Sequence, residues 1–283
     1  MEITLAGEYR AKWGEGPIWW QGALYYVDIE GHCVVRFDPA TGEEKILKVG
    51  ERVGTVVPRE KGGLVIAGDS GFQLLDEDEV RKPIVDPEAG KPDNRFNDGK
   101  CSPDGRFFAG TISLVKKEGD ASLYELNSEL GVREVFGGVT NSNGIAWSPD
   151  GSRVYYIDTP RREIWGFDYD RETGEWSHRS VVVNTSHVDS SPDGMVMDAE
   201  GKVWVAFCHG GCVVRFDVET GEEVQRLELP CVETTACTWG GEQLDELYIT
   251  TGIHKSIEEE DAGRLFVVKG LGVKGVPAFP FRG

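Results

Sequence analysis

The stretch VVRFDPATGEE at residues 34–44 returns almost unchanged as VVRFDVETGEE at residues 213–223. Each copy joins a run of β-branched and aromatic residues, which favours a strand, to a Thr-Gly segment, which favours a turn. A segment repeated so far apart in one chain indicates a fold built from copies of one supersecondary unit. The number of such units in the 283 residues then decides the fold.

Short strand-like runs recur along the whole chain, and Gly-containing turns such as SPDGR at 102–106 precede them. The second residues of six such runs are spaced 40 to 49 residues apart, at Tyr25, Val65, Phe107, Tyr155, Trp204 and Tyr248. A further strand-like run follows each of them. The repeated VVRFD is therefore expected to be the third strand of a four-stranded unit.

Six four-stranded units of this length predict an all-β fold, a six-bladed β-propeller of four-stranded blades. The segments before the first unit and after the last are long enough to share one blade. We therefore expect a single propeller domain over residues 1–283, with the last blade closed by the N- and C-terminal segments. Two β-sandwiches would not explain why all six units carry the same turn.

The composition limits the partners. With 39% hydrophobic residues the chain can bury a substantial core. Its net charge of −19 repels phosphate backbones and anionic lipid, so we expect no nucleic-acid or membrane partner. Cations are better candidate partners for such a chain. The first residues, MEITLAGEYR, lack the features of a signal peptide, and we expect a cytoplasmic monomer.

Six cysteines are scattered without a disulfide framework and are interpreted as reduced and mostly buried. The segment CHGGC offers Cys208, His209 and Cys212 as soft metal ligands. It lacks a second paired motif, and Cys208 directly follows the strand-like run VWVAF. We therefore interpret these residues as structural.

The propeller geometry selects the candidate site residues. The first strand of each blade lines the central channel, so the loops leading into these strands gather at one mouth. Ten to twelve residues upstream of the six spaced positions stand Glu15, Thr55, Arg95 with Asn97, Asn143, Asp193 and Cys237. Taken singly, most of these are explained as turn formers or solvated charges. In separate blades these residues stand at nearly the same offset from the repeated strand, which we call their shared phase. This favours a common site.

Glu15, Asn143 and Asp193 offer carboxylate and amide oxygens, the donors preferred by hard divalent cations. We expect one divalent cation here, Ca²⁺ first, with Zn²⁺, Mg²⁺ and Mn²⁺ as alternatives. No GxSxG motif suggests a serine nucleophile, and the histidines fall outside the shared phase, His187 being nearest to it.

Four ordered motifs resemble the senescence-marker-protein/gluconolactonase/regucalcin-like family, and the resemblance runs through nearly the whole chain. They are GEGPIW at 14–19, RFNDGKCSPDGRFFAGT at 95–111, SNGIAWSPDG at 142–151 and PDGMVMDAEGKVWVA at 192–206. The resemblance implies a six-bladed propeller, a single divalent metal in the channel and hydrolysis of sugar lactones.

By motif, the resemblance assigns metal ligation to Glu15, Asn143 and Asp193 and substrate contact to Arg95 and Asn97. Some family members place a substrate-binding Glu after the AGT strand. Glu118 is the nearest candidate there, in a segment that aligns poorly and where an exposed loop charge is an equal interpretation.

The expected function is a metal-dependent lactonase acting on a small sugar lactone, in which the cation polarises the carbonyl and activates water. Asp193 is the candidate general base. One alternative is a non-catalytic calcium-binding or interaction propeller, and another is a phosphotriesterase-like hydrolase using the same metal site. A metal-free enzyme of the strictosidine-synthase kind is disfavoured by the oxygen donors of Glu15, Asn143 and Asp193.

Overall fold

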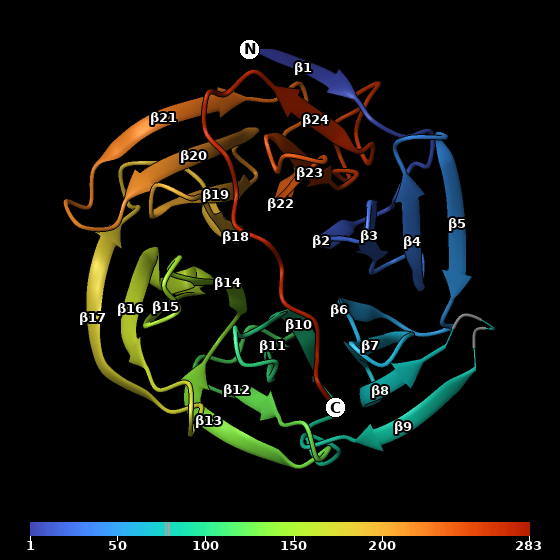
Figure 1. Ribbon diagram of the computed structural model, residues 1–283, viewed down its shortest axis with the longest axis vertical. Coiled ribbons are helices and arrows are strands. Elements are labelled where there is room, and N and C mark those ends of the chain that lie inside the picture. The colour runs from blue at the N-terminus through green and yellow to red at the C-terminus, as the bar shows by residue number, and fades with distance from the viewer. Residues whose placement is uncertain (77, 79) are drawn as a thin grey trace.

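The computed structural model describes residues 1–76, 78 and 80–283, and over these the chain is almost entirely β. Its strands form six four-stranded antiparallel sheets arranged around a central axis (Figure 1). The six-bladed propeller predicted from the repeat is thereby confirmed. The only helical segment in this part of the chain is the single 3₁₀ turn η1 (Thr159–Arg161).

The first five blades run from the channel outward in chain order, and the sixth has the N-terminal strand as its outermost one. The first three blades comprise β2 (Gly14–Trp20), β3 (Ala23–Asp28), β4 (Cys33–Asp38) and β5 (Glu43–Lys48); β6 (Val53–Pro58), β7 (Leu64–Gly68), β8 (Gly71–Leu75) and β9 (Arg81–Val85); and β10 (Asn94–Cys101), β11 (Phe107–Ser113), β12 (Ala121–Leu126) and β13 (Val132–Val139). The next two comprise β14 (Ser142–Trp147), β15 (Arg153–Asp158), β16 (Glu163–Tyr169) and β17 (Trp176–Asn184); and β18 (Ser191–Met197), β19 (Lys202–Cys208), β20 (Cys212–Asp217) and β21 (Glu223–Glu228). The sixth contains β22 (Thr234–Gly240), β23 (Glu246–Thr251), β24 (Phe266–Lys269) and the N-terminal β1 (Glu2–Leu5).

Both copies of VVRFD occupy third strands, β4 and β20, as expected. A strand in the middle of a blade has a neighbouring blade on each face, so both of its faces are covered. This explains why the middle strands read as continuous apolar runs instead of alternating with polar residues. In β7, for example, every residue of LVIAG is buried.

The two ends of the chain take part in the ring differently. β1 pairs antiparallel with β24, so the outermost strand of the sixth blade comes from the beginning of the chain. The segment after β24 crosses the centre of the ring at one end (Figure 1). It is held there by hydrogen bonds such as that from the Phe281 N–H to the Pro58 carbonyl, at 2.8 Å.

Every innermost strand has a bulge near its start. The register shifts fall between Glu15 and Ile18, Val53 and Thr55, Phe96 and Gly99, Asn143 and Ile145, Pro192 and Met195, and Thr234 and Ala236. A bulge adds one residue to a strand and redirects the side chains beside it. A Cβ at Gly194 would overlap Ala236 of the next innermost strand, so only glycine fits in the bulge of β18.

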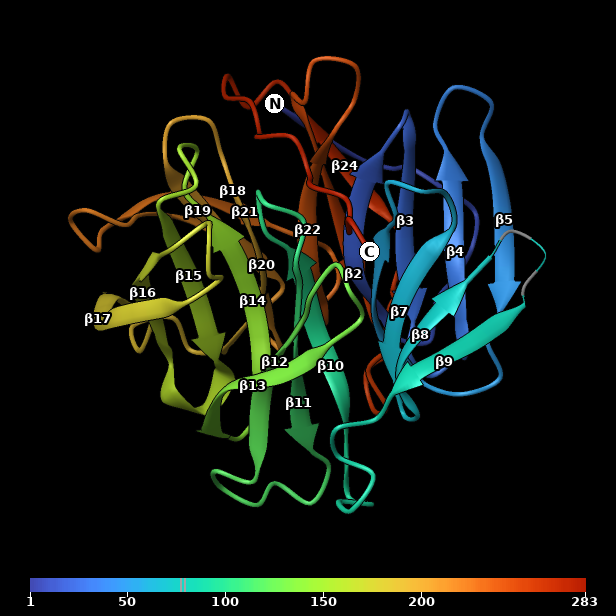
Figure 2. The same ribbon diagram turned by 60° about the horizontal axis from the view of Figure 1, so that its bottom comes forward.

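The bulges thus determine which side chains face the channel mouth. Figure 2 shows the innermost strands running roughly parallel through the molecule, with their connecting loops at two opposite ends. None of the helical residues described forms a helix long and apolar enough to cross a membrane.

Candidate functional site

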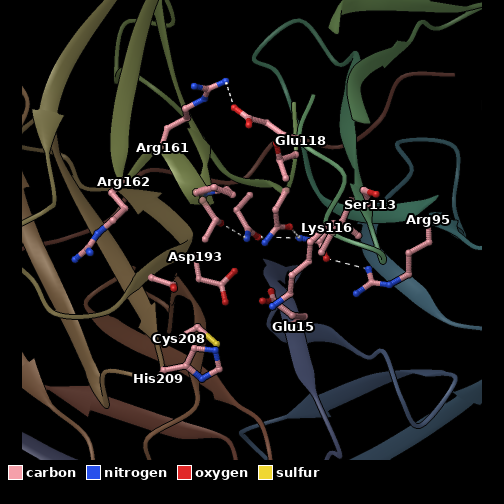
Figure 3. A pocket seen from close by; sticks show the side chains of 18 of the residues that line it. Glu15, Arg95, Ser113, Lys116, Glu118, Arg161, Arg162, Asp193, Cys208 and His209 are labelled. Atoms are coloured by element: carbon pink, nitrogen blue, oxygen red, sulfur yellow. Dashed lines mark hydrogen bonds and ion pairs between the residues drawn. The ribbon is translucent and has the colours of Figure 1, made fainter. Parts of the chain in front are cut away.

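A cavity of about 760 Å³ opens at the channel mouth where the innermost strands begin (Figure 3). All six residues predicted for the site line it: Glu15, Arg95, Asn97, Glu118, Asn143 and Asp193. They come from the innermost strands of four blades and, for Glu118, from the loop between β11 and β12. Residues up to 178 positions apart in the chain therefore share one cavity, which leaves their individual roles as predictions.

Glu15 and Asp193 form the acidic centre of the cavity. Both side chains are buried, with 5% and 7% of their surface exposed, and Figure 3 shows them directed into the same space. Glu15 accepts a hydrogen bond from the Gly16 N–H at 2.8 Å. Burial, followed by the charge of Asp98, raises the pKa of Glu15 to about 8, and burial together with Glu15 raises the pKa of Asp193 well above its usual value.

Hydrogen bonds at both ends of its amide fix the orientation of Asn143. Its Nδ2 donates to Thr159 Oγ1 at 2.8 Å, and its Oδ1 accepts from Asn97 Nδ2 at 3.1 Å. Thr159 in turn donates to the Pro192 carbonyl at 2.9 Å. An amide oxygen has two acceptor positions, so Asn143 Oδ1 keeps one for a further ligand.

These three residues fit a hard divalent cation. Two carboxylates and one amide oxygen are all-oxygen donors of the kind that Ca²⁺ and Mg²⁺ take in proteins, with water completing the coordination. Burial is the first cause of both raised pKa values, so carboxylate anions are unfavourable in this cavity. A cation between Glu15, Asn143 and Asp193 would remove that cost.

Arg95 and Asn97 form one wall of the cavity. Arg95 Nη1 donates to the Phe96 carbonyl at 2.7 Å and to Asn97 Oδ1 at 2.9 Å. The buried Arg95 Nε has no hydrogen-bond partner among the described residues. Burial lowers the pKa of Arg95 to about 10, so the guanidinium remains charged at neutral pH. Arg95 thus has hydrogen-bonding capacity left for a ligand.

Asn97 has little such capacity. Its Nδ2 lies within hydrogen-bond distance of the Ser142 carbonyl, Asn141 Oδ1 and Asn143 Oδ1, at 2.8, 3.2 and 3.1 Å. It therefore links Arg95 to Asn143 and fixes both, and its direct contact with substrate stays a prediction.

Glu118 lies at the outer rim. Its side chain is 81% exposed and its Oε1 is 3.6 Å from Arg161 Nη2 (Figure 3). Lys116 and Arg162 also line the cavity, and sequence reasoning missed them together with Arg161. All three lie on loops or on η1, outside the phase of the innermost strands, so the strand period carried no signal for them. The rim of the cavity thus carries more positively charged side chains than the negative net charge of the chain suggests.

The other residues in the shared phase lie elsewhere. Thr55 is fully buried and donates to the Gly99 carbonyl at 3.0 Å, and Cys237 Sγ faces the Trp204 carbonyl at 3.5 Å. Both follow the bulge of their strand, so they face the interior of the channel instead of its mouth. His187 is on the surface, 3.3 Å from Glu223.

Asp98 and Lys100 lie deeper in the channel and were also missed. Burial raises the pKa of Asp98 and lowers that of Lys100, while the charge of each opposes the shift of the other. Lys100 Nζ donates to the Met195 carbonyl at 2.8 Å. The motif RFNDGK contains both residues, yet only the bulge after Phe96 reveals that they point inward.

Cys208 and His209 line the cavity next to Asp193 (Figure 3). His209 falls outside the shared phase of the innermost strands, and yet it lines the cavity. It follows β19, the second strand of its blade, so the spacing of the innermost strands carried no signal for it. The third residue of that motif, Cys212, points away, into the core and toward Arg226.

Comparison with known proteins shows the family of this chain. Residues 13–253 match the SMP-30/gluconolactonase/LRE-like region. Regucalcin from Xenopus laevis is 39% identical over 100% of this chain and 98% of its own. A luciferin-regenerating enzyme superposes with a TM-score of 0.91 at 28% identity, covering 97% of this chain and 96% of its own. Regucalcin from Agrobacterium tumefaciens, described as a calcium-binding protein, superposes with a TM-score of 0.90 at 25% identity, covering 98% and 95%. The chain belongs to the SMP-30/gluconolactonase/LRE-like family.

Proposed function

We propose that the protein is a divalent-metal-dependent lactonase that opens a small sugar lactone. The observation that carries the proposal is the meeting of Glu15, Asn143 and Asp193 in one cavity that Arg95 also lines. The family name includes gluconolactonase, and a relative is described as calcium-binding, which supports Ca²⁺ as the first ion to test.

Hydrolysis of a lactone needs an electrophile, a water molecule and a proton acceptor. A divalent cation held by Glu15, Asn143 and Asp193 would polarise the lactone carbonyl and make water more acidic. Asp193 would accept the proton of the attacking water while the oxygen of that water bonds to the carbonyl carbon. The ring C–O bond then breaks, and the ring oxygen takes up the proton as the new hydroxyl.

The remaining residues orient the substrate. Arg95 lines the cavity, and its guanidinium would offer N–H donors in a fixed plane to the sugar hydroxyls. Asn97 keeps Arg95 and Asn143 in register through hydrogen bonds to both. Glu118, at the rim, would reach a hydroxyl far from the reacting carbonyl.

The test is a panel of aldonolactones and phosphotriesters assayed with metal-stripped protein, with Ca²⁺, Mg²⁺, Mn²⁺ and Zn²⁺ restored one at a time. We expect lactone hydrolysis only with metal. Asp193→Asn should lower kcat/KM by at least about 10²-fold, the usual contribution of a general base. The matched control is Asp189→Asn, an exposed acid just before β18 and outside the cavity, which should behave like the wild type.

Three results would contradict the proposal. Undiminished activity of Asp193→Asn would remove the mechanism. Metal binding without turnover of any substrate would favour a non-catalytic calcium-binding propeller. Turnover of phosphotriesters in preference to lactones would favour the other hydrolase class.

A further inference from the structure

One carboxylate at the edge of the cavity gathers three donors. Glu233 is 1% exposed and accepts from Cys208 Sγ at 3.1 Å and from the backbone N–H of His209 at 3.1 Å. Glu233 also contacts His209 Nδ1, at 2.9 Å. One ligand atom from each of Cys208, His209 and Glu233 lies within 4.8 Å of the other two.

The cluster is built where two blades meet. Cys208 ends β19 and pairs in an isolated antiparallel bridge with Glu233, which precedes β22 of the next blade. His209 begins the turn into β20 with a left-handed backbone, φ 68°. Residues of this conformation other than glycine are uncommon and concentrate where the surroundings hold them. Here both the backbone and the ring of His209 are fixed on Glu233.

A second histidine lies beside the carboxylate and beside the His209 ring. His254 Nε2 is 3.8 Å from Glu233, and its Nδ1 accepts the Ser256 N–H at 3.0 Å. Because Nδ1 is an acceptor, the proton of a neutral His254 ring sits on Nε2, facing Glu233. At this distance His254 makes no hydrogen bond to Glu233, and it lies outside the group of three candidate ligands, as an outer neighbour.

We propose that Cys208, His209 and Glu233 form a second metal site that selects Zn²⁺ or a similar borderline cation. A thiolate, an imidazole and a carboxylate are the ligand types that Zn²⁺ takes, and three protein ligands with one open position are typical of zinc sites that face a cavity. Cys208 and His209 both line the cavity, so the open position would be reached from it. This set of ligands differs from the set that the CHGGC motif offers, because Glu233 takes the place of Cys212 as the third ligand.

Charge balance allows this site beside the oxygen-only site. On binding, the Cys208 thiol would release its proton to solvent, and the thiolate and the Glu233 carboxylate would together offset the two charges of the ion. A cation held at Glu15, Asn143 and Asp193 would then face a nearly neutral neighbour. Without a cation, burial together with Asp193 and Glu233 raises the pKa of the Cys208 thiol, which disfavours Cys208 as a nucleophile.

Cobalt tests the site directly, because a thiolate bound to Co²⁺ gives a charge-transfer absorption that oxygen ligands do not give. Metal-stripped wild-type protein saturated with Ca²⁺ and titrated with Co²⁺ should show this absorption and bind one further ion per chain. Cys208→Ser should abolish the absorption. His209→Ala removes an exposed ring and should weaken Co²⁺ binding by at least about tenfold, as changes around metal ligands commonly do.

Two control variants match these changes. Cys212→Ser removes the other cysteine of the motif, and His178→Ala removes a histidine with 83% of its side chain exposed on an outer strand. Both should keep the absorption. No absorption in the wild type, or the same absorption in Cys208→Ser, would overturn the proposal. So would a Cys208-dependent absorption with one bound cation in total, because Cys208 would then belong to the oxygen site. None of these readouts depends on lactonase activity.

Discussion

The two ends of the central channel differ in chemistry although the same innermost strands line both. At the beginning of β14 and β18, Asn143 and Asp193 face an open cavity whose lining residues are mostly polar or charged. At the end of the same strands, Trp147 and Met197 line a small, mostly apolar space that the C-terminal segment around residues 276–279 covers. The change of character follows the bulge in each strand.

The difference between the two ends of the channel indicates that one end serves ligand binding and the other serves the stability of the fold. Before the bulge, polar side chains are buried near the axis, and the raised pKa values of Glu15 and Asp193 show that this is unfavourable without a ligand. After the bulge, apolar side chains such as Trp147 and Met197 pack and close the ring, with the charged side chain of Lys100 among them. Changes at the polar end should therefore alter binding and turnover, while changes at the apolar end should alter the free energy of unfolding.

The largest effect is expected at the apolar end, from Trp239→Ala. Trp239 is 2% exposed, packs edge to face on Trp204 with centroids 5.7 Å apart, and contacts Gly275 of the C-terminal segment. Truncating a buried aromatic residue costs about 3–5 kcal/mol. Denaturant unfolding should show this loss, while Ca²⁺ affinity of the folded protein should stay unchanged. An equal loss of Ca²⁺ affinity would contradict the separation of the two ends.

The next effect is expected at the polar end, from Glu15→Gln. The neutral amide removes a buried carboxylate, so the metal-free variant should melt at a higher temperature than the metal-free wild type. Ca²⁺ at a hundred times its Kd should stabilise the wild type by about 2.7 kcal/mol and the variant much less. Calorimetry with and without Ca²⁺ measures both.

The matched control for this change is Glu129→Gln, an exposed acid in the loop after β12. It should respond to Ca²⁺ like the wild type. If Glu15→Gln kept the full Ca²⁺ response, Glu15 would not be a ligand.

A smaller effect is expected for Arg95→Lys. A lysine cannot reproduce the planar set of donors, so one or more hydrogen bonds of about 1.5–3 kcal/mol each should be lost, which lowers kcat/KM about 10- to 100-fold. Steady-state kinetics should place most of the change in KM, with Ca²⁺ affinity unchanged. A fall in Ca²⁺ affinity instead would mean that Arg95 serves the cation site.

The smallest effect is expected for Glu118→Gln. An exposed ion pair such as Glu118–Arg161 contributes about 0–1 kcal/mol, so the fold should not change. Loss of a contact with a substrate hydroxyl should raise KM several-fold with kcat unchanged. The same KM as the wild type would show that Glu118 only pairs with Arg161.

The fold was predictable because the repeat is visible in the sequence of the strands themselves. Each blade needs the same apolar strands and turns, so Tyr25, Val65, Phe107 and their counterparts recur at a nearly constant spacing. The meeting of Glu15, Asn143 and Asp193 in one cavity followed from the same period. It could be predicted because innermost strands must begin at the same mouth.

The rest of the site was not predictable from that period. A constant offset ignores the bulges, which is why Thr55 and Cys237 were grouped with residues of the mouth although they lie below it. Lys116 lies on a loop and Arg161 on η1, and the strand period does not determine the course of either segment. The contact of Cys208 with Glu233 joins two blades, and no spacing within one blade indicates it.

The most direct test of the cation site is a crystal structure of the protein with Mn²⁺, examined by anomalous scattering. A strong peak is predicted between the carboxylates of Glu15 and Asp193 and Oδ1 of Asn143, about 2.1–2.6 Å from each oxygen, the range of hard divalent ions. The absence of a peak among these oxygens in crystals saturated with Mn²⁺ would contradict it, whether or not a second peak lies at Cys208, His209 and Glu233.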